Sequence, residues 1–187
     1  MRYPEDHKAQ TRQRIIEEAS RRFRREGVAV TGLQPLMKAL GLTHGGFYAH
    51  FGSKDELVGL ALEHAAEQMD EQTAAVFASE DPLPLFISSY LSDRHRDHPD
   101  QGCPLPTLCA ELGQRGTPNA RTDSLVGDRL ALIREALGES DSGRAELILA
   151  ALVGGLQLAR SVQDPALSRQ LIERVVAQLQ ELIRPAS

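Results

Sequence analysis

A short stretch in the N-terminal third of the chain carries the residues best suited to bind phosphates. Residues 43–51 read THGGFYAHF, and a lysine follows at position 54. Tyr48 and His50 can donate hydrogen bonds to phosphate oxygens without a full charge, and Lys54 begins a predicted helix, where free amides also favour anions. Gly45 and Gly46 have no side chain, so the backbone there can approach a DNA backbone or base edge closely. The residue types therefore predict contact with a nucleic acid.

Other chemistries lack a matching motif. The sequence has no P-loop, no Gly-x-Ser-x-Gly, no His-Glu-x-x-His and no Gly-x-Gly-x-x-Gly, so it predicts neither an enzyme nor a bound cofactor. His95 and His98, with Asp93 and Asp97 nearby, could share one helix face as metal ligands. Two histidines are too few for a site, and cations are favoured at a helix C-terminus in any case. We therefore predict no metal.

The two cysteines, Cys103 and Cys109, allow two interpretations. Cys103 precedes a predicted helix, and a helix N-terminus lowers a thiol pKa, which would suit a redox or electrophile sensor. Most free cysteines, however, are small buried apolar residues. Both interpretations stay open for Cys103, and Cys109 is the weaker sensor candidate. A count of two cysteines in 187 residues fits a reducing cytoplasm.

The elements that must position these residues are helices. Apolar residues recur every three to four positions, and no stretch alternates as a strand would. Asp81-Pro82, Thr117-Pro118 and Asp164-Pro165 each place a capping side chain before a proline, which predicts three helix starts. The sequence therefore predicts an all-α fold of about nine helices. The expected ranges are 8–26, 33–40, 44–50, 54–78, 82–97, 104–115, 118–137, 143–163 and 165–184.

Two of these helices form a helix-turn-helix pattern. The predicted helices 33–40 and 44–50 are separated by a turn at Gly41, and Thr43 is placed to cap the second one. Ser53 and Glu56 form a capping box that starts the next helix. Residues 1–54 carry 10 Lys and Arg against 5 Asp and Glu, whereas residues 55–187 carry 11 against 21. A basic N-terminal part on an acidic body indicates that this end meets phosphates.

Residues 8–57 resemble the N-terminal domain of the TetR family of bacterial repressors. The residues that carry the resemblance are Phe23, Gly27, Thr31, Ala39, Gly41, Thr43, Gly45, Phe47, Tyr48, His50, Phe51, Ser53, Lys54 and Leu57. The resemblance implies a three-helix DNA-binding domain with a helix-turn-helix, over residues 1–53. It also implies a helical effector-binding and dimerisation domain over residues 54–187. One departure is Pro35, which falls early in the first helix of the motif; if Gly32 caps that helix, Pro35 is its third residue and disturbs no hydrogen bond.

The resemblance also assigns individual residues. It implies that Phe23, Phe47 and Phe51 are core residues. It implies phosphate contacts at Thr31, Thr43, Tyr48, His50 and Lys54, and base-edge contacts at His44, Gly45 and Gly46. The Arg21–Arg25 run is interpreted as a solvated helix face, whereas Arg12 and Arg14 lie nearer the helix start and can reach a DNA backbone.

The C-terminal part offers less specific signals. Its last two helices are apolar and joined tightly at Asp164-Pro165, and Gly154-Gly155 would let another helix approach closely. The resemblance implies that such a pair forms a dimer interface; the alternative is that the apolar stripes are buried within one subunit. The expected interface residues are Leu152, Gly155, Leu156, Leu171, Val175 and Leu179. Apolar faces, together with the cysteines, suggest an effector pocket or sensor at Cys103, Cys109, Leu62, Met69, Phe86, Tyr90, Leu108 and Leu132.

Taken together, the sequence predicts a ligand-responsive repressor that binds a palindromic DNA operator as a homodimer and is released by a small molecule. The alternative is a helical small-molecule-binding protein without sequence-specific DNA binding. The N-terminus lacks the apolar middle of a signal peptide, and the longest apolar run, 147–156, is 10 residues. Because a bilayer-spanning helix needs about 20 residues, we expect a cytoplasmic protein with no membrane partner.

Overall fold

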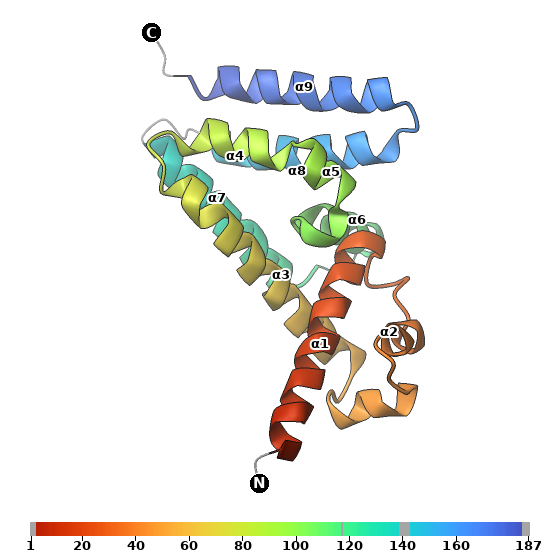
Figure 1. The fold of residues 1–187 in the computed structure, drawn as a ribbon. Coiled ribbons are helices and arrows are strands. Elements are labelled where there is room, and N and C mark those ends of the chain that lie inside the picture. The colour runs from red at the N-terminus through yellow and green to blue at the C-terminus, as the bar shows by residue number, and fades with distance from the viewer. Residues whose placement is uncertain (1–2, 117, 139–142, 185–187) are drawn as a thin grey trace. The chain divides into compact units, whose positions relative to one another are not determined.

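The computed structural model describes residues 3–116, 118–138 and 143–184. These residues form nine α-helices and two 3-10 helices, and they contain no strand (Figure 1). The α-helices are α1 (Tyr3–Glu26), α2 (Leu33–Ala39), α3 (Lys54–Phe77), α4 (Pro82–Tyr90), α5 (Asp93–Asp97), α6 (Leu105–Arg115), α7 (Ala120–Leu137), α8 (Arg144–Ser161) and α9 (Pro165–Leu182). The 3-10 helices are η1 (His44–Ala49) and η2 (Pro99–Gln101). The all-α prediction is confirmed.

Packing divides the chain into two compact units. The first unit comprises Met1–Gln68 and Asp100–Thr117, and the second comprises Met69–Pro99 and Pro118–Ser187. Helix α6 therefore packs with the N-terminal helices, and α3 contributes to both units. The predicted boundary between a DNA-binding domain (1–53) and an effector-binding and dimerisation domain (54–187) is a boundary between functions, and it stays a prediction.

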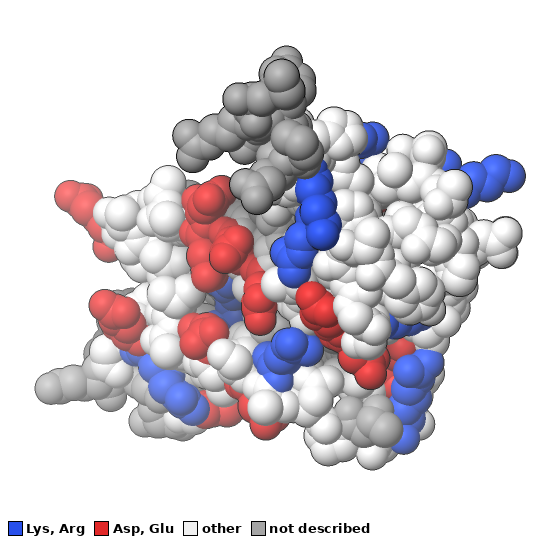
Figure 2. Space-filling model, turned by 90° about the horizontal axis from the view of Figure 1, so that it is seen from below, with Lys and Arg blue, Asp and Glu red and all other residues white. Residues whose placement is uncertain are grey.

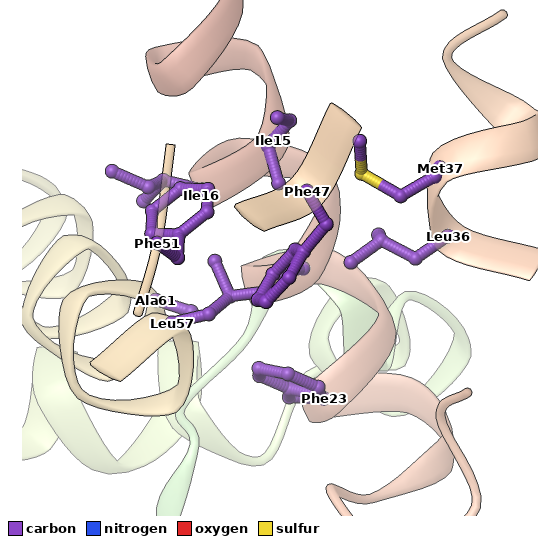
Figure 3. Packing of buried hydrophobic residues seen from close by; sticks show 10 residues of the cluster. Ile15, Ile16, Phe23, Leu36, Met37, Phe47, Phe51, Leu57 and Ala61 are labelled. Atoms are coloured by element: carbon purple, nitrogen blue, oxygen red, sulfur yellow. The ribbon is translucent and has the colours of Figure 1, made fainter. Parts of the chain in front are cut away.

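The core of the first unit fixes the helix-turn-helix. Side chains from α1, α2, η1 and the start of α3 converge in one cluster (Figure 3). The Phe47 and Phe51 rings stack with centroids 5.3 Å apart, and Phe23 completes the aromatic core that the sequence predicts. Leu36 and Met37 are fully buried from the α2 side. Burying one such side chain contributes about 1.5–3 kcal/mol, so this cluster holds η1 firmly against α1 and α3.

The second unit is organised by α8 and α9, which run antiparallel side by side (Figure 1). The Asp164 carboxylate accepts a hydrogen bond of 2.9 Å from the Ala166 amide, so the predicted cap of α9 is confirmed. A Cβ atom at Gly155 would lie 3.4 Å from Val175 Cγ1, so the two helices pack closely at this glycine. Helix α4 packs against α9, and α7 packs against both α4 and α8.

Four predicted elements differ from the structure. The expected helix 8–26 begins five residues earlier, at Tyr3. The expected helix 82–97 is interrupted after Tyr90, because Leu91 leaves helical geometry and the Ser92 hydroxyl caps a new helix by accepting from the His95 amide at 3.2 Å. The expected start at residue 118 is two residues early, since the Asn119 side chain caps α7. Its partner in that prediction, residue 117, lies outside the described residues. Residues 44–49 form a 3-10 helix, because two glycines and six residues give an α-helix little support.

No helix in the described ranges is long and apolar enough to cross a membrane.

Candidate DNA-binding interface

The turn between α2 and η1 is built as the sequence predicts. Gly41 has a φ of +72°, a left-handed conformation that favours glycine. The Leu42 amide then donates to the Met37 carbonyl at 2.9 Å and closes α2. The Thr43 hydroxyl accepts from the Gly46 amide at 3.2 Å, which confirms its capping role. Gly32 caps α2, and Pro35 is the third residue of that helix, as expected.

Helix η1 has a buried side and an exposed side. Phe47 is fully buried, whereas the neighbouring Tyr48 keeps 61% of its surface exposed. His44 and Gly45 are exposed beside it, and the His44 and Tyr48 rings meet edge to face at 6.0 Å. A Cβ atom at Gly45 would meet nothing within 4 Å, so the backbone there is open to an approaching surface. This side presents donors and bare backbone together.

His50 closes η1 next to two basic residues. Its ring is half-buried, and its Nδ1 atom has no hydrogen-bond partner within the described structure. Burial lowers the pKa of His50, and the charges of Lys8 and Arg12 lower it further. Arg12 also lies 5.0 Å over the Phe51 ring and 3.3 Å from the Glu56 carboxylate. The N-terminal part of α1 therefore adds positive charge beside the end of η1.

Two predicted contact residues have other partners. Thr31 is 3% exposed, and its hydroxyl donates to the Gly27 carbonyl at 2.7 Å. The Lys54 ammonium donates to the Val28 and Thr31 carbonyls, each at 2.7 Å. In this conformation Thr31 is a core residue, and the Lys54 ammonium is engaged within the fold. The predicted cap by Ser53 is present, with the Glu56 amide donating to its hydroxyl at 3.1 Å. The carboxylate of Glu56 reaches the Gly52 amide at 2.8 Å, one residue before the predicted partner.

Charged side chains of both signs lie on the face of the molecule that Figure 2 shows. Figure 2 views the molecule from below the orientation of Figure 1, and on the described part of that face Lys and Arg side chains stand among Asp, Glu and uncharged residues. Well-placed donors and close backbone approach are therefore expected to add to the attraction between basic side chains and phosphates.

Two residues that sequence reasoning missed are built into this unit. Arg24, interpreted as part of a solvated face, is 3% exposed and donates to the Gly102 carbonyl at 3.3 Å and the Gln68 side chain at 2.9 Å. The Glu111 carboxylate accepts from the Val28 amide at 2.7 Å and the Ala29 amide at 2.8 Å. No local pattern could have found these partners, because Glu111 lies more than 80 residues from the amides that it binds.

The predicted pocket residues do not fall in one unit. Leu62, Cys103, Leu108 and Cys109 belong to the first unit, and Met69, Phe86, Tyr90 and Leu132 belong to the second. Cys103 is buried and Cys109 is half-buried. Burial raises the pKa of the Cys109 thiol, and the neighbouring Cys103 raises it further by a smaller amount. A raised pKa keeps the Cys109 thiol unreactive. The burial of Cys103 fits the apolar interpretation, and sensing at Cys103 stays a prediction.

A cavity of about 390 Å³ lies within the second unit, between the C-terminal half of α3 and α7. Leu132 lines it, and its other lining residues include Phe77 and the carboxylates of Asp70, Asp128 and Glu135. This volume falls in the range of small-molecule sites. The buried Arg129 forms an ion pair with Asp70 at one side of the cavity. Three carboxylates line the cavity and one arginine pairs with them, so the lining keeps a net negative charge.

The described residues contain no cluster of three metal-ligating side chains. The Nδ1 atom of His95 lies 2.7 Å from the Tyr90 carbonyl oxygen, which can only accept, so Nδ1 carries the hydrogen. Burial lowers the pKa of His95 to about 4; the bond to Tyr90 opposes this shift, and the charge of Arg160 adds to it. His95 is therefore a neutral packing residue at physiological pH.

The lowered pKa of His95 predicts how stability changes with pH. In the unfolded chain this histidine has a pKa of 6.5, whereas in the folded unit its pKa is about 4. Between these two pH values the unfolded chain binds a proton that the folded unit does not. The contribution to stability is thus fully present above pH 6.5 and is lost as pH falls toward 4. Between pH 7 and 4.5, wild type should lose about 2–3 kcal/mol more than His95→Gln. Urea unfolding at both pH values measures this difference, and equal losses in the two proteins would refute the assignment.

The predicted dimer residues lie mostly inside one subunit. Leu152, Leu156 and Leu179 are buried, and Gly155 is buried against Val175, which is itself half-buried like Leu171. The alternative from the sequence, burial within one subunit, therefore describes four of the six residues. The exposed apolar residues of α8 and α9 are different ones: Leu147, Leu158 and Leu167.

A short helix, a tight turn and a second, glycine-containing helix with one exposed side make up a helix-turn-helix, a motif of DNA-binding proteins. Residues 15–61 match the sequence model of the family described as "Bacterial regulatory proteins, tetR family". The chain is 35% identical over 174 residues to the HTH-type transcriptional regulator TtgR of Pseudomonas putida, an alignment that covers 83% of this chain and 82% of that protein. The chain belongs to the TetR family of transcriptional regulators.

Solved structures agree with this assignment. A crystal structure of a TetR transcriptional regulator from Chloroflexus aurantiacus has a TM-score of 0.79 and 25% identity, and the match covers 94% of this chain and 97% of that one. A TetR-family regulator from Cytophaga hutchinsonii has a TM-score of 0.71 and 23% identity. That match covers 95% of this chain and 94% of the other, which shows the shared fold.

Proposed function

We propose that this regulator is a repressor that binds a palindromic operator as a homodimer and is released by a small molecule. The observation that carries the proposal is the exposed side of η1, where Tyr48 and His44 stand beside the open backbone of Gly45. We assign base contacts to His44, Gly45 and Gly46, and phosphate contacts to Thr43, Tyr48 and His50. Thr31 is left out because its hydroxyl is buried and bonded.

The outward face of α8 supports a dimer. Leu147, Ala151, Gly154 and Leu158 are spaced by four, three and four residues, so they share one helix face. Leu147 and Leu158 are 55% and 56% exposed, and a Cβ atom at Gly154 would meet nothing within 4 Å. A bare glycine between two exposed leucines would let a second α8 pack closely across a two-fold axis. This set replaces the buried residues expected from the sequence.

The dimer proposal predicts the effect of Leu158→Glu. A carboxylate buried in an apolar interface is left unpaired and desolvated, so the variant should dissociate at least about 30-fold more readily than wild type. Leu85→Glu is the matched control, because Leu85 is 53% exposed in the same unit but lies on α4. Analytical ultracentrifugation across a concentration series measures both proteins. A dimer in Leu158→Glu as stable as wild type would contradict the proposed interface.

The cavity between α3 and α7 is the proposed effector site. Phe77 and Leu132 supply apolar surface, while Asp70, Asp128 and Glu135 supply carboxylates. These groups would favour an effector that carries positive charge on an apolar body, and disfavour an anionic one. Such a ligand releases DNA only if it binds the DNA-free conformation more tightly than the DNA-bound one.

Hydroxyl-radical footprinting on the DNA beside the gene tests the operator proposal. A dimer should protect two symmetric half-sites whose centres lie about 34–36 Å, or a multiple of that, apart. Cationic amphipathic compounds are then added to the complex, and loss of the footprint identifies the effector. Protection of a single asymmetric site would contradict the homodimer on a palindrome.

A further inference from the structure

The connection between α1 and α2 is held from two sides by opposite charges. Residues 27–31 form this connection in the first unit. The Lys54 ammonium, from the first turn of α3, donates to the Val28 and Thr31 carbonyls at 2.7 Å. The Glu111 carboxylate, from α6, accepts from the Val28 and Ala29 amides at 2.7 and 2.8 Å. Carbonyls on one side and amides on the other are thus both bonded to charged groups.

The carboxylate of Glu111 fits the backbone closely. Gly27 has a φ of +90°, and a Cβ atom there would lie 2.9 Å from Glu111 Oε2. Thr107, one turn earlier on α6, donates its hydroxyl to the Arg24 carbonyl at 2.7 Å. Arg115 lies 3.3 Å from the other Glu111 oxygen. Helix α6 is therefore fixed to the end of α1 by several polar contacts, and Glu111 bonds directly to the backbone of the connection.

We propose that Lys54 and Glu111 are positioning residues for operator binding: together they hold residues 27–31, and neither contacts DNA. The proposal rests on the operator binding proposed above. Thr31 directly precedes the cap of α2, and Leu36 and Met37 on α2 are buried in the cluster that holds Phe47. Movement of the connection would therefore displace α2 and, through this cluster, the exposed side of η1. This replaces the phosphate contact expected for Lys54 from the sequence.

Salt dependence separates the two roles of Lys54. Each lost phosphate contact reduces the slope of log K against log salt by about 0.9, so a dimer that lost two would change by about 1.8. A positioning residue instead weakens binding without changing the slope. Lys54→Met keeps the apolar stem and removes the charge. We expect binding about tenfold weaker than wild type with an unchanged slope.

Glu111→Gln tests the other side of the connection. If only charge mattered, removing a carboxylate from a DNA-binding unit should strengthen DNA binding. If Glu111 is a positioning residue, we expect binding about three- to tenfold weaker than wild type. Glu63→Gln is the charge-matched control, because Glu63 is exposed on α3 in the same unit, and it should not weaken binding. Hydrogen exchange at the Val28 and Ala29 amides supplies a second readout, with exchange at least about tenfold faster in Glu111→Gln than in the control.

The outcomes separate this inference from the proposed function. A slope that falls by about 1.8 in Lys54→Met makes Lys54 a phosphate ligand and overturns the proposal. Unchanged or tighter binding by Glu111→Gln, or unchanged amide exchange, also overturns it. If wild type binds no operator, the proposed function fails, and amide exchange in both variants still decides whether the two charges hold the connection.

Discussion

Gly45→Glu should abolish operator binding while leaving the protein folded. The Cβ position at Gly45 is open, and the residue does not have a positive φ, so a side chain fits without strain. In the proposed DNA complex that side chain would stand between η1 and the base edges, with its carboxylate in the negative field of the surrounding phosphates. Because like charges brought together cost several kcal/mol, we expect operator affinity to fall at least about 100-fold. Fluorescence anisotropy with labelled operator measures the loss.

Two further substitutions at Gly45 separate charge from size. Gly45→Gln has nearly the same volume as Gly45→Glu without the charge and should lose less affinity. Gly45→Ala should stabilise the fold by up to about 1 kcal/mol, because alanine loses less backbone entropy than glycine in a helix. If Gly45→Glu binds the operator within about threefold of wild type, η1 does not face DNA.

Phe47→Ala should cost the first unit about 3–5 kcal/mol of unfolding free energy. Phe47 is fully buried, stacks on Phe51, and joins residues from α1, α2 and α3. Removing a buried aromatic ring loses its transfer free energy and leaves a cavity. Since stabilities of whole domains are about 5–15 kcal/mol, the variant should lose a large fraction of its stability, and a less stable unit should bind the operator more weakly. Urea unfolding followed by circular dichroism measures the change.

Tyr48→Ala provides the matched control for Phe47→Ala. It removes an aromatic side chain of similar size one residue away, but from a position that is 61% exposed. We expect a stability cost under about 1 kcal/mol together with weaker operator binding. The pair thus separates a folding role from a contact role. Comparable stability losses in the two variants would mean that the two sides of η1 have been assigned wrongly.

The sequence predicts the local structure of the motif well, because its signals are local. Thr43 and Ser53 cap the helices that follow them, and Gly32 allows Pro35 in α2, as expected. Each of these interactions joins residues within four positions. The burial of Phe23, Phe47 and Phe51 follows from a family resemblance that covers the whole motif.

Long-range polar contacts could not be predicted in the same way. Glu111 looks like an ordinary charged residue on α6, and its role depends on amides more than 80 residues away. Arg24 lies in a run that is typical of a solvated face, yet Gly102 and Gln68 make its burial possible. On α8, apolar spacing does not distinguish a stripe that packs on α9 from one that faces outward, so the sequence predicts Leu152 rather than Leu158 at the interface.

The central claim is that this chain binds a specific DNA sequence through the exposed side of η1. The most direct measurement compares the affinity of the purified protein for DNA from beside its own gene with its affinity for random DNA of equal length, from about 50 to 200 mM salt. We expect at least about 10³-fold tighter binding to the first DNA near physiological salt, with both affinities falling steeply as salt rises. Equal, weak binding to both DNAs, repeated with longer DNA from the region around the gene, would contradict sequence-specific binding through η1. That result would favour a helical small-molecule-binding protein.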